Sequence, residues 1–228
     1  MDFGTDFDQF FITRKRKKYK FAVFNSLDNC YNDDSLIKLQ QVLANSNAPL
    51  TVEIGAGSAL FLTKLAELHP ERHYLAIDRK SDRLYHGAKL AKQLGLTNIN
   101  YLWSNARNIN TIITDGTIDE LWITFPDPWP QESNIKHRLT NPKYLVQYQR
   151  ALAKDGKLNF KTDNQPLFDW SVEQFNNTWH ITHQTHDLHH DPEINQFNTD
   201  ATIMTSYEER YTAEGKPICY LQAIRSTK

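Results

Sequence analysis

Short apolar runs alternate with amphipathic stretches from residue 50 onward, and this alternation predicts βα units around a mostly parallel sheet. The predicted strands cover residues 50–54, 73–77, 99–103, 118–124 and 158–161. Their largely apolar composition is typical of strands buried on both faces. We therefore expect an α/β fold with helices on both faces of the sheet.

Apolar residues at helical spacing predict three helices between these strands. The first starts near Ser58, whose hydroxyl can cap it, and the second is capped by Ser81 and stopped by Gly95. The third starts at Pro142, which suits the first helical position, and ends at Gly156. The predicted buried stripes are Leu60, Phe61, Leu65 and Leu68; Leu84, Ala88, Ala91 and Leu94; and Tyr144, Leu145, Tyr148 and Leu152.

The pattern changes after residue 179, where polar and apolar residues alternate before a polar loop and a last apolar run at 218–224. This change predicts an antiparallel, hairpin-like end to the sheet. We expect an N-terminal arm with a leading helix over residues 1–48 and one domain over 49–228. No apolar run approaches the roughly 20 residues that span a bilayer, and no signal-peptide pattern is present, so we expect a soluble cytoplasmic protein with no membrane partner.

A cluster of basic residues lies near the N-terminus, although the formal net charge of the chain is only -1. The cluster consists of Arg14, Lys15, Arg16, Lys17, Lys18 and Lys20. Such an arm suits a phosphate backbone or an anionic membrane surface, and the alternative is a solvated tail. Phe21, Val23 and Phe24 follow it and are expected to tether it to the body.

Cysteine and histidine patterns give little support for a metal or a disulfide framework. Cys30 and Cys219 are far apart and belong to no paired-cysteine motif. Five histidines gather at positions 180, 183, 186, 189 and 190, but His183 and His186 would face opposite sides of a strand. We expect no metal site, and we interpret these histidines as surface or pocket-rim residues.

The segment after the fourth predicted strand reads Phe125-Pro126-Asp127-Pro128-Trp129-Pro130. Its three prolines fix φ and remove backbone donors, so it forms a loop rather than a strand or an ordinary helix start. Ligands of open α/β sheets bind at the carboxyl ends of strands, where this loop would lie. Asp127 and Trp129 could hold a planar base, although a purely structural turn is the alternative.

Residues after the first predicted strand favour a cofactor site. Gly55 and Gly57 let a ligand approach the backbone closely, but Leu60 stands where a dinucleotide fingerprint has its third glycine. Glu53 would repel a pyrophosphate and attract a cationic amino-acid moiety such as that of S-adenosylmethionine.

The next two predicted strands also end in residues that suit a nucleoside. Asp78 lies 21 positions beyond Gly57, a spacing expected for an acid that binds ribose hydroxyls. Asn105 and Ala106 follow the third strand, where an amide can bind the edge of an adenine. Singly these residues could be a tight turn, a helix cap and a loop, but together they favour a nucleoside-sulfonium site.

With these motifs the chain resembles the tRNA (guanine-N(7)-)-methyltransferase family, class I Rossmann-like enzymes that use S-adenosylmethionine to methylate a guanosine in the tRNA variable loop. The resemblance covers roughly residues 50–224. Its motifs are Glu53-Ile54-Gly55-x-Gly57, Phe-Pro-Asp-Pro-Trp at 125–129, Arg138-Leu139-Thr140, Thr162-Asp163, and Thr205-Ser206-Tyr207-Glu208, which looks like the family's T-x-Y-E motif.

The resemblance implies roles for individual residues. Cofactor contacts are expected from Glu53, Gly55, Gly57, Asp78, Asn105, Ala106 and Asp127, of which Asp127 is the candidate catalytic residue. Substrate contacts are expected from Gln131, Asp163, Thr205, Ser206, Tyr207 and Glu208. Contacts to the tRNA backbone are expected from Arg14, Lys15, Arg16, Lys17, Lys18, Lys136 and Arg138.

The sequence departs from the family at three positions. Gln131 and Glu132 replace basic residues after the loop, and Ala59 replaces a glycine of the cofactor turn. These departures keep other readings open, namely a methyltransferase that acts on another RNA or on an exocyclic amine, or a non-catalytic RNA-binding paralogue. Both a monomer and a homodimer are compatible with the sequence.

Overall fold

The computed structural model describes residues 15–105, 107 and 109–226, and it divides into two compact units. The first unit comprises Met1–Pro49 and Gly55–Ala106, and the second comprises Leu50–Ile54 and Arg107–Lys228. The predicted division into residues 1–48 and 49–228 stays a prediction. No described helix combines the length and the apolar character that a membrane span needs.

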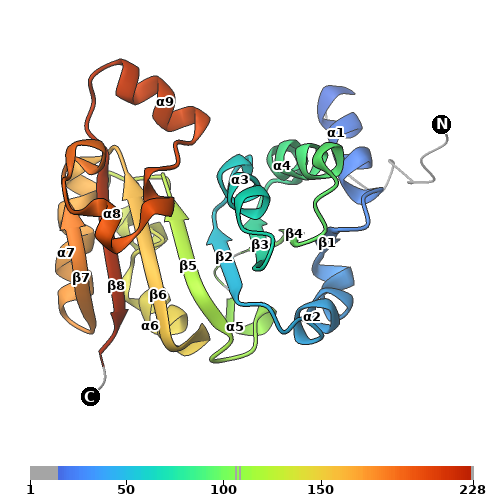
Figure 1. Cartoon of the computed structure of the whole chain (residues 1–228), viewed down its shortest axis with the longest axis horizontal. Helices are drawn as coiled ribbons and strands as arrows, with labels where there is room; N and C mark the ends of the chain where they lie inside the picture. The colour runs from blue at the N-terminus through green and yellow to red at the C-terminus, as the bar shows by residue number, and fades with distance from the viewer. Residues whose placement is uncertain (1–14, 106, 108, 227–228) are drawn as a thin grey trace. The chain divides into compact units, whose positions relative to one another are not determined.

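Three parallel strands form the sheet of the first unit, in the order β1-β4-β3 (Figure 1). Cys30 pairs with Tyr101 across β1 and β4, and Tyr74 pairs with Ile99 across β3 and β4. The elements of this unit are α1 Lys15–Asn25, β1 Cys30–Asn32, the 3-10 turn Asp33–Ser35, α2 Leu36–Ala44, α3 Leu60–Leu68, β3 His73–Asp78, α4 Ser81–Leu94 and β4 Ile99–Trp103.

Five strands form the sheet of the second unit, in the order β2-β5-β6-β8-β7. β2, β5 and β6 are parallel, whereas β8 runs antiparallel to both β6 and β7, which confirms the predicted antiparallel end. The strands are β2 Leu50–Ile54, β5 Ile118–Thr124, β6 Leu152–Thr162, β7 Trp179–Thr185 and β8 Cys219–Arg225. The helices are α5 Ile109–Ile112, α6 Pro142–Ala151, α7 Gln165–Asn176, α8 Ile194–Phe197 and α9 Ser206–Ala213, with 3-10 turns at Glu132–His137, Leu188–His190 and Thr199–Thr202.

The predicted start of α6 at Pro142 is confirmed, and Tyr144 and Tyr148 are buried. Its predicted end at Gly156 is wrong, because the helix ends at Ala151 and β6 follows directly. Gly156 lies inside β6, where a Cβ atom would lie 2.7 Å from the carbonyl oxygen of Ile118. This glycine therefore permits a close approach between β6 and β5.

Two predicted helix caps are wrong. α3 begins at Leu60 after Ala59, which has a left-handed φ of 53°, and α4 follows Lys80; neither preceding residue makes a side-chain cap bond. Leu68 and Leu94 were expected in the core but are 48% and 44% exposed, because each is the last residue of its helix. The predicted stop at Gly95 is confirmed by its φ of 67°.

The helix that carries the basic arm is anchored on its apolar side. Phe21 and Phe24 are buried, and the Phe21 ring meets Trp103 edge-on at 5.4 Å. Val23 is half-buried. The tether predicted from Phe21 and Phe24 is therefore confirmed.

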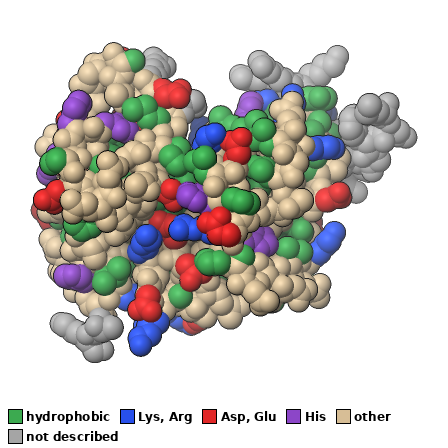
Figure 2. Space-filling view, in the orientation of Figure 1, with side chains coloured by type: hydrophobic (Ala, Val, Ile, Leu, Met, Phe, Trp, Pro, Cys, Tyr) green, Lys and Arg blue, Asp and Glu red, His purple; other side chains and the backbone are tan. Residues whose placement is uncertain are grey.

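The face drawn in Figure 2 shows basic side chains interspersed with acidic ones.

Gly87 allows α4 to pack against the turn that follows Gly55 and Gly57. Its backbone N–H donates to the carbonyl oxygen of Ser58 at 2.9 Å. A Cβ atom at position 87 would lie 2.8 Å from that oxygen and 3.0 Å from the carbonyl oxygen of Ala59. Both contacts are with backbone, so the helix or the turn would have to move to admit a methyl group.

We expect Gly87→Ala to lower the free energy of unfolding by about 1 to 2 kcal/mol, because the clash outweighs the gain of roughly 1 kcal/mol in helix propensity. Urea denaturation measures this change. Gln93→Ala, at an exposed position of the same helix, serves as the control and should change stability by less than about 0.5 kcal/mol. A more stable Gly87→Ala protein would contradict the close packing.

Candidate active site

The loop after β5 holds Asp127 in an exposed position. Phe125 and Trp129 each have a φ of 45°, in the left-handed region, and each precedes a proline. That backbone is unfavourable for aromatic residues before proline and marks a strained loop. Among the described residues the Asp127 carboxylate has no hydrogen-bond partner, so it is available to a ligand.

Arg138 holds this loop through two hydrogen bonds to its backbone. Its Nε donates to the carbonyl oxygen of Pro128 at 3.0 Å, and its Nη2 donates to that of Trp129 at 3.2 Å. The guanidinium lies 4.5 Å from the centre of the Trp170 ring and is buried, and this burial lowers its pKa. Nε and Nη2 of Arg138 thus stabilise the loop, and the contact of Arg138 with the tRNA backbone stays a prediction.

Glu53 lies beside the start of the same loop, on β2. Its side chain is buried and accepts a hydrogen bond from Thr124 Oγ1 at 2.5 Å. Thr124 is the last residue of β5 and directly precedes Phe125. Glu53 thus fixes the end of the strand from which the loop departs, and its contact with a cofactor stays a prediction.

The Thr-x-Tyr-Glu segment is the N-terminal capping box of α9. Thr205 Oγ1 accepts the backbone N–H of Glu208 at 3.0 Å, and Glu208 Oε2 accepts the backbone N–H of Thr205 at 3.1 Å. The exposed Tyr207 ring lies 5.2 Å from the Phe125 ring. This contact places α9 beside the loop that carries Asp127. The Ser206 side chain lies outside the described residues.

Glu208 also forms a fully buried ion pair with Lys161 of β6. Lys161 Nζ lies 2.8 Å from Glu208 Oε2 and donates to the carbonyl oxygens of Ala201 and Ile203 at 2.9 and 3.2 Å. His189 Nε2 lies 2.9 Å from the other carboxylate oxygen, Oε1. Burial lowers the pKa of Lys161, whereas the charges of Glu208 and Glu53 raise it. The Glu208 side chain is therefore buried under the start of α9. A guanine base could hydrogen-bond to it only by replacing the bonds to Lys161 or His189.

The remaining predicted substrate residues lie on the surface of the second unit. Asp163 is half-buried and directly follows β6, ahead of Asn164, which caps α7. Gln131 and Lys136 are exposed, and Gln131 Oε1 accepts a hydrogen bond from Asn134 at 3.0 Å. Their contacts with RNA stay predictions.

The predicted cofactor residues of the first unit are linked to one another. Gly55 and Gly57 have φ values of 71° and 55°, and a Cβ atom on Gly57 would meet nothing within 4 Å. Asp78 accepts the backbone N–H of Gly57 at 2.9 Å and that of Lys80 at 2.8 Å. Burial raises the pKa of Asp78, and these hydrogen bonds partly offset the rise. The turn and the acid are thus held in one arrangement.

Asn105 lines a pocket of about 380 Å³ at the carboxyl ends of β4 and β1, together with Arg79 and Trp103. Asp33 forms part of its wall and accepts a hydrogen bond from Ser104 Oγ at 2.5 Å. Sequence reasoning missed Asp33, because no motif links it to a site 71 positions away. Ala106 lies outside the described residues.

The basic arm is described only in part. Arg14 lies outside the described residues, as do the side chains of Lys15 and Arg16. Lys17 Nζ lies 3.7 Å from Asp82 of α4, and Lys18 is half-buried.

Four histidines of the cluster, at positions 183, 186, 189 and 190, contact carboxylates. His183 lies 2.8 Å from Asp191, and His186 lies 2.9 Å from Asp169. No group of three potential metal ligands occurs among the described residues.

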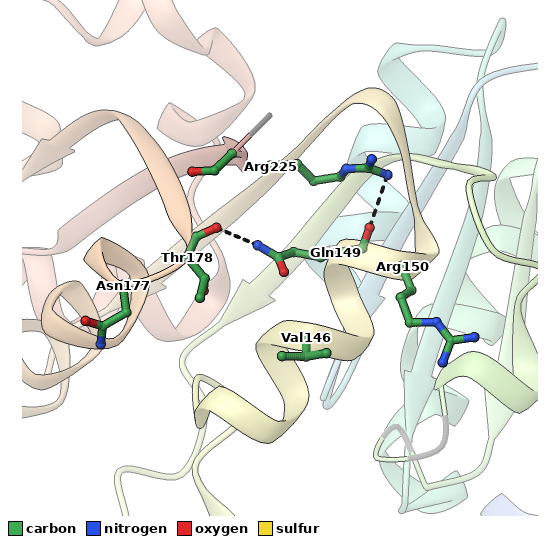
Figure 3. Close-up of a pocket in the computed structure, with 7 residues that line it drawn as sticks. Val146, Gln149, Arg150, Asn177, Thr178 and Arg225 are labelled. Carbon is green, nitrogen blue, oxygen red and sulfur yellow. Dashed lines mark hydrogen bonds between the residues drawn. The ribbon is translucent and has the colours of Figure 1, made fainter. Parts of the chain in front are cut away.

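A pocket of about 490 Å³ lies at the other end of the second unit's sheet (Figure 3). Arg225 and Gln149 line it; Arg225 Nη1 lies 3.4 Å from the carbonyl oxygen of Leu152, the first residue of β6, and Gln149 Nε2 donates to Thr178 at 2.7 Å. The loop with Asp127 follows the carboxyl end of β5, so this pocket is separate from the candidate site.

Comparison with known proteins identifies the family. Residues 47–221 match a family model described as a putative methyltransferase. The tRNA (guanine-N(7)-)-methyltransferase of Lachnoclostridium phytofermentans is 36% identical over 82% of this chain and 86% of its own length. That of Cytophaga hutchinsonii is 37% identical over 81% and 83%. The chain belongs to the tRNA (guanine-N(7)-)-methyltransferase family.

Solved structures agree on the fold of this methyltransferase. The 16S rRNA methyltransferase KamB has a TM-score of 0.61 at 16% identity, over 82% of this chain and 92% of its own. The 16S rRNA (adenine(1408)-N(1))-methyltransferase from Catenulisporales acidiphilia has a TM-score of 0.57 at 16% identity, over 84% and 92%. These likenesses confirm the predicted class I α/β fold.

We expect Arg138→Met to lower the free energy of unfolding by about 1 to 3 kcal/mol, because the carbonyl groups of Pro128 and Trp129 lose their donors. Urea denaturation measures this, and Lys136→Met, two positions away and exposed, is the control. Equal stability of the two variants would contradict the role of Arg138 in the loop.

Lys161→Met is expected to cost about 3 to 5 kcal/mol, because it leaves the Glu208 carboxylate buried without its cation. Adding Glu208→Gln should restore part of this loss, since the uncompensated charge is then removed. A double-mutant cycle by urea denaturation gives the coupling energy. Additive losses from the two substitutions would show that the pair is not coupled.

Proposed function

We propose that this enzyme transfers a methyl group from S-adenosylmethionine to N(7) of a guanosine in the variable loop of tRNA. The observation that carries the proposal is Asp127, an exposed carboxylate without a hydrogen-bond partner among the described residues, on a strained loop held by Arg138. The family membership of the chain supports the reaction and the substrate.

The residues of the first unit fit S-adenosylmethionine, which supplies an electrophilic sulfonium methyl group when bound. Open space at Gly57 and the left-handed turn at Gly55 permit a ligand to approach the backbone. Asp78 accepts the backbone N–H groups of Gly57 and Lys80, and its remaining lone pairs can accept hydrogen bonds from ribose hydroxyls. Asn105, in the pocket beside Trp103, can bind the edge of the adenine.

Methyl transfer to guanine N(7) depends on the positioning of the reacting groups and needs no general base. Guanine N(7) has a lone pair and no proton to remove, so alignment of the nucleophile is the main requirement. We propose that Asp127 orients the guanine and faces the sulfonium side, while Asp163 accepts a hydrogen bond from the base. Glu208 acts through Thr205 and α9, because its own oxygens are occupied by Lys161 and His189.

A different RNA substrate is the second candidate, and the exposed loop after Trp129 favours it. Gln131 and Glu132 are both exposed, so neither supplies the cation that a phosphate needs. Lys136 is an exposed basic residue in the 3-10 turn Glu132–His137, which follows the loop, and we propose it as the phosphate contact in this turn.

Asp127→Asn and Asp127→Ala are expected to lower turnover at least about 100-fold, because misplacing the reacting groups has effects of this order. The assay uses labelled S-adenosylmethionine and unmodified total tRNA, followed by nuclease digestion and mass spectrometry. Label in 7-methylguanosine in the wild type would support both the reaction and the substrate.

Glu132→Gln, at an exposed position near the loop, is the matched control and should stay active. Circular dichroism and calorimetric binding of S-adenosylmethionine show whether the Asp127 variants keep fold and cofactor. Full turnover by both Asp127 variants would remove this residue from the mechanism.

A further inference from the structure

A groove between α1 and α4 in the first unit has a volume of about 360 Å³. Tyr19 and Lys20 of α1 line one side, and His86, Lys89 and Gln93 of α4 line the other. None of these residues belongs to the motifs of the candidate active site.

The groove has fixed walls. α1 is held by the burial of Phe21 and Phe24, which lie on the side of the helix away from the solvent. Lys17 contacts Asp82 at 3.7 Å, and Lys20 Nζ lies 2.8 Å from His86 Nε2, so the two helices meet along their length. The groove is therefore preformed, which reduces the entropic cost of binding a ligand.

Lys20 and Lys89 line the groove, and no acidic residue among the described ones lines it. α1 carries five basic residues and no acidic one. α4 adds Arg83, Lys89 and Lys92 against one acid, Asp82. Lys89 and Lys92 are exposed and have no ion-pair partner among the described residues. A polyanion could therefore bind without breaking existing salt bridges at these two lysines.

An aromatic ring accompanies these cations. Tyr19 is 57% exposed and meets Tyr85 edge-on at 6.4 Å, which steadies the ring but leaves much of it open. Lys20 Nζ lies 5.7 Å from the centre of the Tyr85 ring. Lysines beside an open aromatic ring are typical of surfaces that bind RNA backbone and stack an unpaired base.

We propose that this groove binds the phosphate backbone of the RNA substrate through Lys20 and Lys89, with Lys92 one turn further along α4 adding a contact beside it, and stacks one unpaired base on Tyr19. The proposal rests on the function proposed above and adds a second RNA contact, on elements other than the reactive loop. Lys89 and Lys92 of α4 would thereby add to the RNA contacts that the resemblance implies for the N-terminal arm.

The test compares the variant Lys89→Glu/Lys92→Glu with the control Lys38→Glu/Lys154→Glu, which changes the net charge equally at exposed lysines outside the groove. Fluorescence anisotropy with unmodified tRNA gives Kd over a range of salt concentrations. The groove variant should raise Kd at least about 10-fold and reduce the slope of log Kd against log salt by about 1 to 2, as expected for one or two lost phosphate contacts. The control should match the wild type.

Tyr19→Ala should raise Kd several-fold, whereas Tyr19→Phe, which keeps the ring face, should not. Calorimetry should show unchanged binding of S-adenosylmethionine in every groove variant. Equal Kd values for the groove variant and the lysine control would overturn the proposal. So would wild-type protein that fails to bind tRNA but sediments with phosphatidylserine vesicles.

The two proposals fail in different ways. If wild-type protein binds tRNA through the groove but leaves no label in 7-methylguanosine, the proposed function fails and the groove stands. If label appears and the groove variant retains wild-type Kd and KM for tRNA, the groove fails and the proposed function stands.

Discussion

The buried ion pair between Lys161 and Glu208 is the interaction on which the reactive half of this enzyme depends. Two charges removed from water are costly unless each is fully hydrogen-bonded. Here the ammonium also donates to Ala201 and Ile203, and the carboxylate is also bound by His189 and by the N–H of Thr205. One pair therefore joins a central strand, an irregular segment and the start of α9.

The ion pair is linked to the loop that carries Asp127 by a backbone hydrogen bond and by a contact between two aromatic rings. The carbonyl oxygen of Lys161 accepts the N–H of Phe125 at 2.9 Å, and the Phe125 ring contacts Tyr207 on α9. Arg138 holds the other end of the loop. Strained residues persist only where their surroundings over-determine them, and these contacts do so for Phe125 and Trp129. A rigid loop suits a reaction whose main demand is alignment.

Much of this arrangement is visible in the sequence, since it rests on local patterns. Apolar runs located β2, β4 and β5, and the prolines identified the loop at 125–130 as non-regular. The spacing of Thr205 and Glu208 contains the capping-box signal, although the family motif alone suggested a substrate contact. Long-range partners gave no signal: Lys161 is 47 positions from Glu208, and Arg138 is buried through its contact with Trp170. Leu68 and Leu94 show that periodicity overestimates burial at the last residue of a helix.

The outer strands have a consequence for self-association. β1, at one edge of the first unit's sheet, has only three residues, and β7, at one edge of the second unit's sheet, has a register irregularity between Ile181 and His183. Short and irregular edge strands are poor templates for pairing with a strand of another chain. Pairing of a strand from another copy of the protein with β1 or with β7 is thus disfavoured.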